Sequence, residues 1–266
     1  NRDKLSAAGI PCHEWPIAAA SVLAATRAAP ARPLADQSKL QPVPMPGAAS
    51  EAGWLASHAA FSLLQQAGFP VARWAIANDP DGAVAAACGL GFPVVLKAER
   101  PGLVHKSEAN AVRLGLCDGN AVAQAFEDFS RSLGPGPALV QEQAGPGVEL
   151  FIGARRDPAF GPVVMAGLGG IWIEALGDTA LRLAPIEEDE ALLMLGELKG
   201  RKALSGLRGK APVCMARFAG LAARVSQWFA AAAWLGELDL NPVIASGKDF
   251  TIADARMRIA SHSITT

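Results

Sequence analysis

The stretch "VVLKAERPGLVHKS", residues 94–107, begins as an apolar run and ends in a cluster of hydrogen-bond donors. The continuous run "FPVVLKA" around its start is typical of a buried strand. Lys97 near the end of that strand either extends its ammonium group to solvent or meets an anion. His105, Lys106 and Ser107 follow in the connection to the next expected strand. That loop is either solvated or binds an anion such as phosphate, in which case His105 is a candidate nucleophile.

Composition narrows the classes of protein to which the chain belongs. It has 266 residues, of which 51% are hydrophobic and 18% charged, and this balance predicts a packed globular core. The net charge of −1, without a long basic block, argues against a nucleic-acid partner held by bulk electrostatics. No apolar run reaches the ~18–20 residues that span a bilayer, so we expect no membrane partner.

The cysteines predict the cellular compartment of the protein, and the first residues predict that the sequence is part of a longer one. The four cysteines form no CxxC pair, which argues against a zinc site or a disulfide framework: Cys12, Cys88, Cys117 and Cys214. Scattered thiols suit a cytoplasmic protein. The chain begins with Asn and carries no secretory signal, so we expect a fragment of a longer protein.

A proline-rich segment divides the chain. Residues 30–50 contain five prolines and almost no periodicity, which is the composition of a linker. We therefore expect a short N-terminal part, residues 1–29, and a folded domain over 51–266. Mixed helices and strands predict an α+β fold with two lobes, about 70–136 and 137–260. The short strands that follow residue 137 at close intervals predict an antiparallel meander.

We expect the following elements from periodicity and cap residues. The helices cover 51–67, 80–90, about 187–199 and about 213–235, with another that begins near a cap at Asn120. The strands are "PVARWAIA", "FPVVLKA", "AVRLGL", "ALVQEQ", "VELFIGARR", "GPVVMAGL", "IWIEALG", "ALRLAP", "ELDLNPVIA" and "FTIADARMRI".

Two further stretches carry candidate ligand residues. In "ELDLNPV", residues 237–243, Asp239 and Asn241 are two positions apart on a strand, so their oxygens project from one face. Such a pair is either an exposed polar strand end or a site for Mg²⁺ shared with nucleotide phosphates. In "GLGGIWIEALGD", Glu174 is either a solvated carboxylate or a metal ligand. The chain has no GxGxxG motif and no complete P-loop, so a nucleotide would be bound by another geometry.

In combination and in this order, the motifs resemble the ATP-grasp domain of NDP-forming acyl-CoA synthetases. That family includes the β subunit of ADP-forming acetyl-CoA synthetase and, more distantly, succinyl-CoA synthetase. The resemblance covers residues 51 to about 260, and its matching stretches are "GFPVVLKAERPGLVHKSEANAV", "LVQEQAGPGVELFIGARRDPAFGPVVMAGLGGIWIEALGD", "LRLAPI", "LSGLRGKAPV", "ELDLNPV" and "ADAR". It implies an ATP-grasp fold with a nucleotide cleft between two lobes. Residues 1–29 look like the tail of a preceding CoA-ligase domain.

The resemblance also implies a role for individual residues around the phosphates. Lys97 would reach the nucleotide phosphates, and Lys106 and Ser107 would lie in the loop that covers them. His105 matches a histidine that receives the phosphoryl group. Arg182, and on weaker grounds Arg208, would contact phosphate.

The resemblance also implies which residues contact the base, the ribose and the metal ion. Gln141 and Glu142 lie at the adenine hinge, and Glu149 would take the ribose hydroxyls. Asp239 and Asn241 match the metal-binding acid-x-Asn-Pro motif, with Glu174 as a third ligand of Mg²⁺.

The reaction implied is that of an acid–thiol ligase. Acyl-CoA, ADP and phosphate would interconvert with acid, CoA and ATP, through acyl phosphate and phosphohistidine. The partners implied are ATP or ADP and the CoA-binding and CoA-ligase domains, upstream in the same chain or on a separate subunit.

One departure from the family pattern affects the loop. The family has Ser-Asp-x-Gly-Gly after His-Lys, whereas this chain has Ser107-Glu108-Ala109-Asn110-Ala111. Asn tolerates a left-handed backbone and Ala does not readily, so we expect a changed loop path and weaker nucleotide binding. This motivates an alternative, a regulatory module that binds ATP without turnover. An ATP-grasp carboxylate–amine ligase would explain Lys97, Asp239 and Asn241 equally well, but not the His-Lys-Ser loop.

Overall fold

The computed structural model describes residues 40–45, 53–103, 106, 109–170, 178–206 and 212–260. All of them belong to one of the two units into which the chain divides, Ala35–Thr266. The expectations for residues 1–29 and for most of segment 30–50 lie outside the described residues. Of the helices in the described ranges, none is long and apolar enough to cross a membrane.

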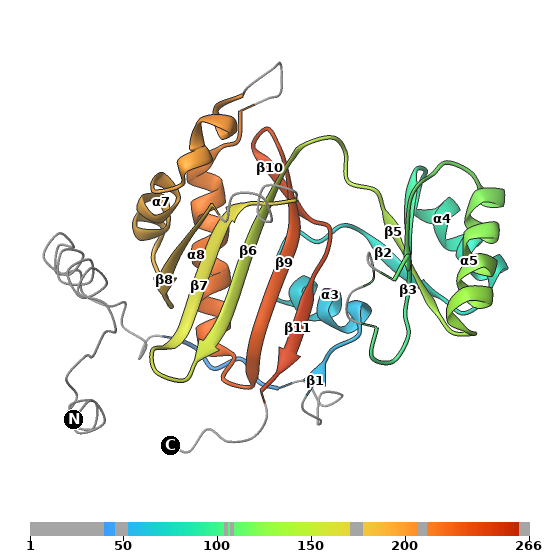
Figure 1. The fold of residues 1–266 in the computed structure, drawn as a ribbon, viewed down its shortest axis with the longest axis horizontal. Helices are drawn as coiled ribbons and strands as arrows, with labels where there is room; N and C mark the ends of the chain where they lie inside the picture. Colours follow the sequence, from blue (N-terminus) through green and yellow to red (C-terminus); the bar gives the residue numbers. More distant parts are fainter. Residues whose placement is uncertain are drawn as a thin grey trace, which may run out of the picture. The chain divides into compact units, whose positions relative to one another are not determined.

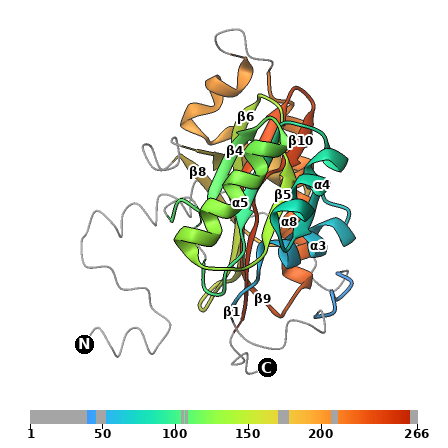
Figure 2. The same cartoon turned by 90° about the vertical axis from the view of Figure 1, so that its right-hand side faces the viewer.

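The smaller of two sheets has four antiparallel strands in the order β2-β5-β3-β4. Their bounds are Trp74–Ala77 for β2, Val94–Ala98 for β3, Val112–Leu116 for β4 and Ala138–Glu142 for β5. Helices α4 (Pro80–Leu90) and α5 (Gly119–Leu133) cover one face of this sheet (Figures 1 and 2). Their apolar sides pack on alternate strand residues such as Leu96 and Val140, which leaves the other face open to a cavity.

Two expectations for this lobe are wrong. Helix α5 is capped by Asp118, whose carboxylate accepts the Ala121 N–H at 2.8 Å, and not by Asn120, which lies inside the first turn. Strand β5 pairs with β2 and β3, so the chain leaves the smaller sheet after Glu142 and not near residue 137. Propensity alone cannot detect this, because strand pairing is a long-range contact.

The larger sheet is also antiparallel, in the order β1-β11-β9-β6-β7-β8, with β10 paired to β9. Its strands are β1 Gly53–Trp54, β6 Val148–Asp157, β7 Gly161–Leu168, β8 Thr179–Leu183, β9 Leu235–Ser246, β10 Asp249–Ile252 and β11 Arg256–Ile259. The helices of this lobe are α3 Ser57–Gln66, α7 Glu188–Gly196 and α8 Met215–Ala231, with a 3₁₀ helix over Lys199–Ser205.

The predicted meander is confirmed for β6-β7-β8, while β9 lies beside β6 on the other side. The stretch "FTIADARMRI" is not one strand: residues 253–255 separate β10 from β11. The expected strand "IWIEALG" lies outside the described residues.

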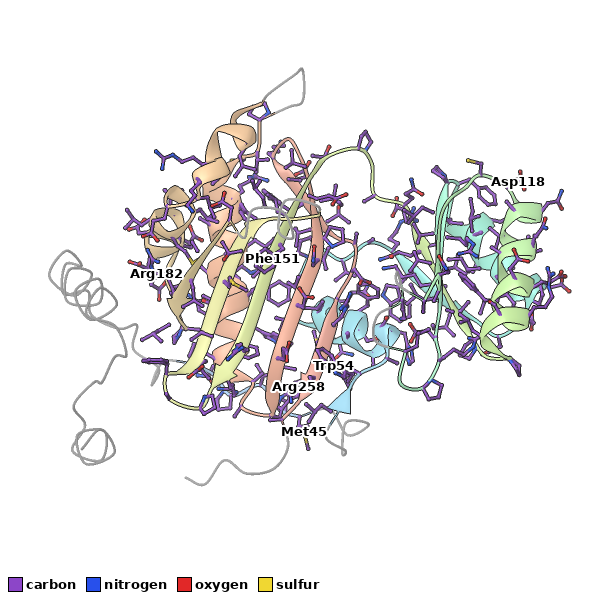
Figure 3. The ribbon with its side chains drawn as sticks, viewed as in Figure 1. Met45, Trp54, Asp118, Phe151, Arg182 and Arg258 are labelled. Carbon is purple, nitrogen blue, oxygen red and sulfur yellow. The ribbon has the colours of Figure 1, made fainter. Side chains whose placement is uncertain are left out.

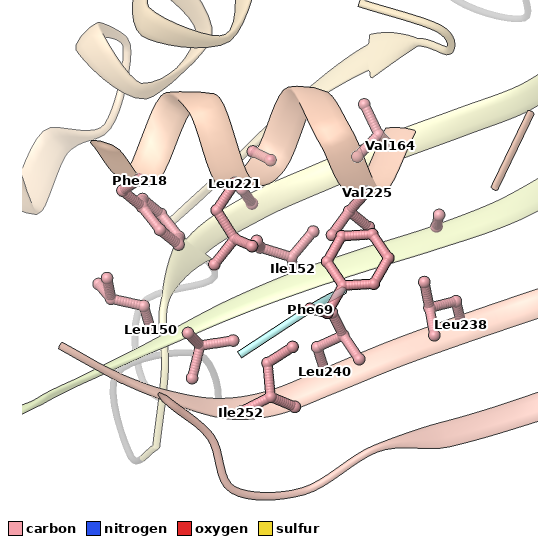
Figure 4. Packing of buried hydrophobic residues seen from close by; sticks show 14 of the residues in the cluster. Phe69, Leu150, Ile152, Val164, Phe218, Leu221, Val225, Leu238, Leu240 and Ile252 are labelled. Carbon is pink, nitrogen blue, oxygen red and sulfur yellow. The ribbon is translucent and has the colours of Figure 1, made fainter. Parts of the chain in front are cut away.

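The main core lies between the larger sheet and helix α8. Phe218, Leu221 and Val225 of α8 face Ile152 and Leu240 of the central strands (Figure 4). Burying side chains of this size contributes roughly 1.5–3 kcal/mol each. The opposite face of β9 is thereby left for polar residues.

A β-bulge interrupts the central strand pair. Leu150 pairs with Val243 and Ile152 with Leu240, so Asn241 and Pro242 lie opposite the single residue Phe151. Pro242 therefore shifts the register within β9 rather than ending the strand. Bulges of this kind often re-aim a side chain next to a functional site.

The unusual loop sequence is accommodated without strain at residue 111. Asn110 has a φ of 54° and is the one non-glycine residue with positive φ in the described ranges. Ala111 is fully buried in the smaller core, and its N–H donates to the Lys106 carbonyl at 2.8 Å. The expectation that alanine at position 111 would be unfavourable is therefore wrong for the backbone of that residue.

We predict that the left-handed backbone at Asn110 distinguishes two substitutions. Asn110→Ala should lower the free energy of unfolding by about 1 kcal/mol, because Ala tolerates this conformation poorly, whereas Asn110→Gly should leave it nearly unchanged. Urea denaturation measures both variants. Equal stability of the two would contradict the assigned backbone conformation.

Candidate functional site

A cavity of about 900 Å³ lies between the open face of the smaller sheet and residues of β6, β9 and the β10–β11 connection in the larger one. The smaller sheet contributes Val95, Lys97, Val112, Leu114 and Gln141. The larger sheet and its turns contribute Glu149, Asn241, Ile244, Asp254 and Arg256, and residues 142–148 connect the two walls. Its volume and mixed lining are those of a small-molecule site.

Part of the cavity wall is apolar. Val112 pairs with Lys97 in the sheet register, and Leu114 lies two positions further along the same face of β4. The side chain of Leu114 is 70% exposed although it is large and apolar. An exposed leucine at a cavity wall is suited to contact a flat apolar group such as a nucleotide base.

Lys97 meets an anion of the protein itself. Its side chain is buried, and its ammonium group donates to the Asp254 carboxylate and to the Ala253 carbonyl, both at 2.7 Å. It also lies 5.4 Å from the centre of the Phe61 ring. Of the two sequence interpretations, extension to solvent is therefore wrong. The buried ammonium group is fixed at the cavity wall with its charge balanced by Asp254.

Carboxylate and amide oxygens lie on β9 and in the connection from β10 to β11: Asn241 and Asp254 line the cavity with Lys97, whereas Asp239 is not among its lining residues. Asp239 lies across from Arg256 in the β9–β11 register, and the expected face is confirmed because Leu238 and Leu240 are buried on the other side. Burial raises the pKa of the Asp239 carboxyl. Arg256 opposes that change, while Asp254 and Glu237 add to it.

Asp254 is the residue that sequence reasoning missed. It belongs to the matching stretch "ADAR", for which the sequence predicts no role, because the metal ligands are expected at Asp239, Asn241 and Glu174. The backbone of residue 253 is hydrogen-bonded to the Pro242 carbonyl at 3.0 Å, which brings Asp254 next to Asn241 along the cavity wall. A carboxylate in the connection between the two strands that pair with "ELDLNPVIA" is the signal that identifies it.

The donor set suits a hard cation. Asp239, Asn241 and Asp254 offer two carboxylates and an amide oxygen, which are ligands that Mg²⁺ prefers. No group of three or more His, Cys, Asp or Glu side chains is placed to hold a metal within the described ranges. Phosphate oxygens would have to complete the coordination of a cation. Glu174, the expected third ligand, lies outside the described residues.

The expected hinge residues lie on one wall. Gln141 is 2% exposed, and its Nε2 has no hydrogen-bond partner in the described part of the chain. Glu142 accepts from Arg73 Nε at 2.8 Å, and this hydrogen bond lowers the pKa of the carboxyl. Gly170 has a φ of 61°, which favours glycine there, and a Cβ at this position would displace the Glu149 carboxylate.

The other phosphate candidates separate in space. Lys106 lines the cavity, but its ammonium group contacts the Glu99 carboxylate and the Ser57 hydroxyl. Arg182 lies on β8 away from the cavity lining (Figure 3) and forms ion pairs with Glu190 and Glu197 on or just after α7. His105, Ser107 and Arg208 lie outside the described residues.

Sequence comparison with known proteins identifies the family of this chain and several of its relatives. A sequence profile of the ATP-grasp domain matches residues 47–259. The acetate–CoA ligase [ADP-forming] I of Archaeoglobus fulgidus is 38% identical over 201 residues, which is 73% of this chain and 29% of that protein. The β subunit of acetate–CoA ligase [ADP-forming] I from Pyrococcus furiosus is 34% identical over 202 residues, 73% of this chain and 87% of that subunit.

Solved structures agree with the sequence comparison. Acetyl-coenzyme A synthetase 1 of Ca. Korarchaeum cryptofilum, in complex with coenzyme A, Ca-AMPCP and HgCl⁺, superposes with a TM-score of 0.74. The two are 38% identical, and the match covers 78% of this chain and 94% of that one. The chain therefore spans less than a third of the A. fulgidus ligase and most of the separate β subunit.

The raised pKa of Asp239 predicts that the free energy of unfolding of the metal-free protein depends on pH. In the metal-free protein the folded state holds this proton more tightly than the unfolded state, so stability falls as pH rises through the folded pKa. Asp239→Asn should therefore stabilise the protein at pH 7 in EDTA, because it removes a charge that burial disfavours. The gain should shrink as the pH is lowered towards 4.

Thermal unfolding across this pH range measures the difference. Glu127→Gln, on an exposed site of α5, is the control and should show no comparable change. A destabilised Asp239→Asn protein at pH 7 in EDTA would contradict the prediction.

Proposed function

The chain belongs to the ATP-grasp family, in the group that includes the β subunits of ADP-forming acetate–CoA ligases, and we propose that it is the nucleotide-binding, phosphoryl-transfer part of an acyl-CoA synthetase. The full reaction would interconvert acyl-CoA, ADP and phosphate with acid, CoA and ATP. The observation that carries the proposal is a cavity whose lining combines the buried Lys97, paired with Asp254, with Asn241 and with an apolar wall at Val112 and Leu114.

The proposed nucleotide pose follows from the chemistry of the two walls. The base lies against Val112 and Leu114, where Gln141 and the backbone of residues 142–144 offer polar partners. Glu149, at the far wall, accepts the ribose hydroxyls. The phosphates then extend towards Lys97, whose ammonium group is suited to an anion.

Mg²⁺ is the proposed cofactor, bound with the nucleotide. A related structure of the K. cryptofilum enzyme contains Mg-AMPPCP, is 38% identical to this chain and covers 78% of it with a TM-score of 0.69. When bound, the cation would offset the negative charge that develops on the transferred phosphoryl group. Asp239, Asn241 and Asp254 would hold it. Asp254 would then be shared between the cation and Lys97, with which it already forms an ion pair.

His105 is the proposed phosphoryl acceptor. An imidazole nitrogen forms a bond to the γ-phosphorus while the bond from that phosphorus to the β–γ bridging oxygen breaks, and ADP leaves. Transfer to a carboxylic acid gives acyl phosphate, and attack by the CoA thiol releases phosphate. In the K. cryptofilum structure with Mg-AMPPCP, a phosphohistidine segment points towards the nucleotide-binding site.

The partners proposed are CoA-binding and CoA-ligase domains. The match covers 29% of the longer ligase from A. fulgidus but 87% of a separate β subunit, so both arrangements exist among the relatives. ATP and CoA are cytoplasmic metabolites, and we therefore propose a cytoplasmic location.

The main alternative, an ATP-binding module without turnover, depends on the lost glycines of the loop. Asn110 supplies the left-handed backbone and Ala111 needs none, which removes part of the reason for that alternative. CoA dependence of ATP formation separates a synthetase from a carboxylate–amine ligase.

Phosphoryl transfer to His105 can be tested with γ-labelled ATP and Mg²⁺ on the full-length protein. We expect protein-bound label that is labile in acid and stable in base, and its complete loss in His105→Ala. His262→Ala, which removes a histidine beyond the residues that match the family, should retain the label. Labelling of His105→Ala at the wild-type rate would show that another group is the acceptor.

Lys97 should be required for the same step. Lys97→Met should lower the labelling rate at least 10-fold, on the order of the loss of one preorganised charge at a transition state, and Lys97→Arg should recover part of it. Because Asp254 then lacks its partner, the unfolding temperature needs to be measured alongside. Wild-type labelling by a folded Lys97→Met protein would contradict the assigned role.

A further inference from the structure

Glu99 is a buried carboxylate that neither the family motifs nor the cavity accounts for. We propose that Glu99 is a positioning residue, which binds Lys106 and thereby fixes the chain next to His105 for phosphoryl transfer. The role in phosphoryl transfer rests on the proposed function, whereas the contacts of Glu99 are present in the structure itself. It assigns Lys106 to the support of the loop rather than to the phosphates.

The carboxylate of Glu99 is fully engaged by protein donors. Glu99 is 5% exposed, and its Oε2 accepts the Ser57 N–H at 3.1 Å and lies 3.4 Å from His58 Nδ1. Its Oε1 contacts the ammonium group of Lys106. A buried charge needs such partners, because an unpaired one is strongly unfavourable. The ion pair with Lys106 therefore compensates the buried charge of Glu99.

Helix α3 provides the fixed end of the contact. Ser57 is its first residue, so Glu99 lies at a helix N-terminus, where N–H groups and the helix dipole favour a negative charge. Phe61 and Leu64 of α3 are fully buried in the main core. Glu99 therefore joins the end of β3 to a helix that is held by the larger lobe.

Lys106 is fixed through its main chain as well. Its carbonyl accepts the Ala111 N–H at 2.8 Å, and the Ala111 carbonyl accepts the Ala98 N–H at 2.9 Å. The ammonium group and the carbonyl of one residue are thus attached to two elements. His105 precedes Lys106 directly, and consecutive Cα atoms are about 3.8 Å apart. A displacement of Lys106 would therefore displace the proposed acceptor.

The two cavity lysines differ in the partner that neutralises them. Asp254, the partner of Lys97, lines the cavity and can exchange contacts with a ligand. Glu99 is absent from the cavity lining in the described part of the protein and lies behind Lys106. A phosphate that recruits Lys106 would leave the Glu99 charge buried without its main partner. This difference favours a structural contact for Lys106.

The test compares Glu99→Gln, Lys106→Gln and the double variant. Two readouts are used: amide hydrogen exchange of residues 104–110, and the rate of labelling by γ-labelled ATP in the full-length protein. Each single variant should speed exchange in this segment and slow labelling about 10-fold, while the Kd for ATP changes less than twofold. In the Lys106→Gln background, Glu99→Gln should have less than a twofold further effect.

Matched variants separate positioning from loss of fold. Glu127→Gln makes the same chemical change on an exposed site of α5 and should alter neither readout. Lys106→Arg restores the charge and should recover most of the labelling. If Glu99→Gln does not fold, Lys106→Gln and Lys106→Arg still carry the test.

Three results would overturn the proposal. Unchanged exchange over 104–110 in both folded single variants would show that the pair does not hold the segment. A Kd for ATP raised 10-fold or more by Lys106→Gln but not by Glu99→Gln would make Lys106 a phosphate ligand. Independent effects of the two substitutions would show that Glu99 does not act through Lys106. Absence of label in the wild-type protein would instead refute the proposed function, and the exchange measurement would still decide the role of Glu99.

Discussion

The ion pair between Lys97 and Asp254 is the interaction on which the arrangement of the cavity depends. It joins two residues 157 positions apart in the sequence, one from each sheet. The lysine side chain is 7% exposed and that of Asp254 26%, so removal of Asp254 would leave a buried ammonium group with only the Ala253 carbonyl as its hydrogen-bond partner. The pair therefore holds the two cavity walls in register and keeps the charge of the lysine balanced before any ligand is bound.

Much of the fold follows from local patterns in the sequence. The alternation in "ELDLNPV" correctly assigned Leu238 and Leu240 to the core and Asp239 to the other face, because the two-residue period of a strand leaves no alternative. The helix over 80–90 and the strand around Lys97 are found where they were expected, since proline, glycine and apolar runs mark their ends. The ATP-grasp identity followed from the order of such motifs.

The partners of the polar residues were not predictable in the same way. That Lys97 is neutralised by Asp254, and Lys106 by Glu99, depends on contacts between elements that the sequence does not place together. Arg182 was expected at the phosphates, but its strand turns it towards two glutamates at α7. In each case local pattern identified a charged residue, and the tertiary fold decided its counter-charge.

The register of β9 also constrains how this domain can change during evolution. Its buried leucines alternate with Asp239 on a strand that pairs on both sides, with β6 and β11. Between Glu237 and Leu240 both ladders are regular, so a single residue inserted or deleted there would exchange the two faces, turning a leucine away from the core and the carboxylate into it. Substitutions in this stretch preserve its two faces as long as apolar and polar residues alternate, whereas a change in its length does not. The turn that joins Ser246 to Asp249 lies outside the paired residues and is free of this constraint.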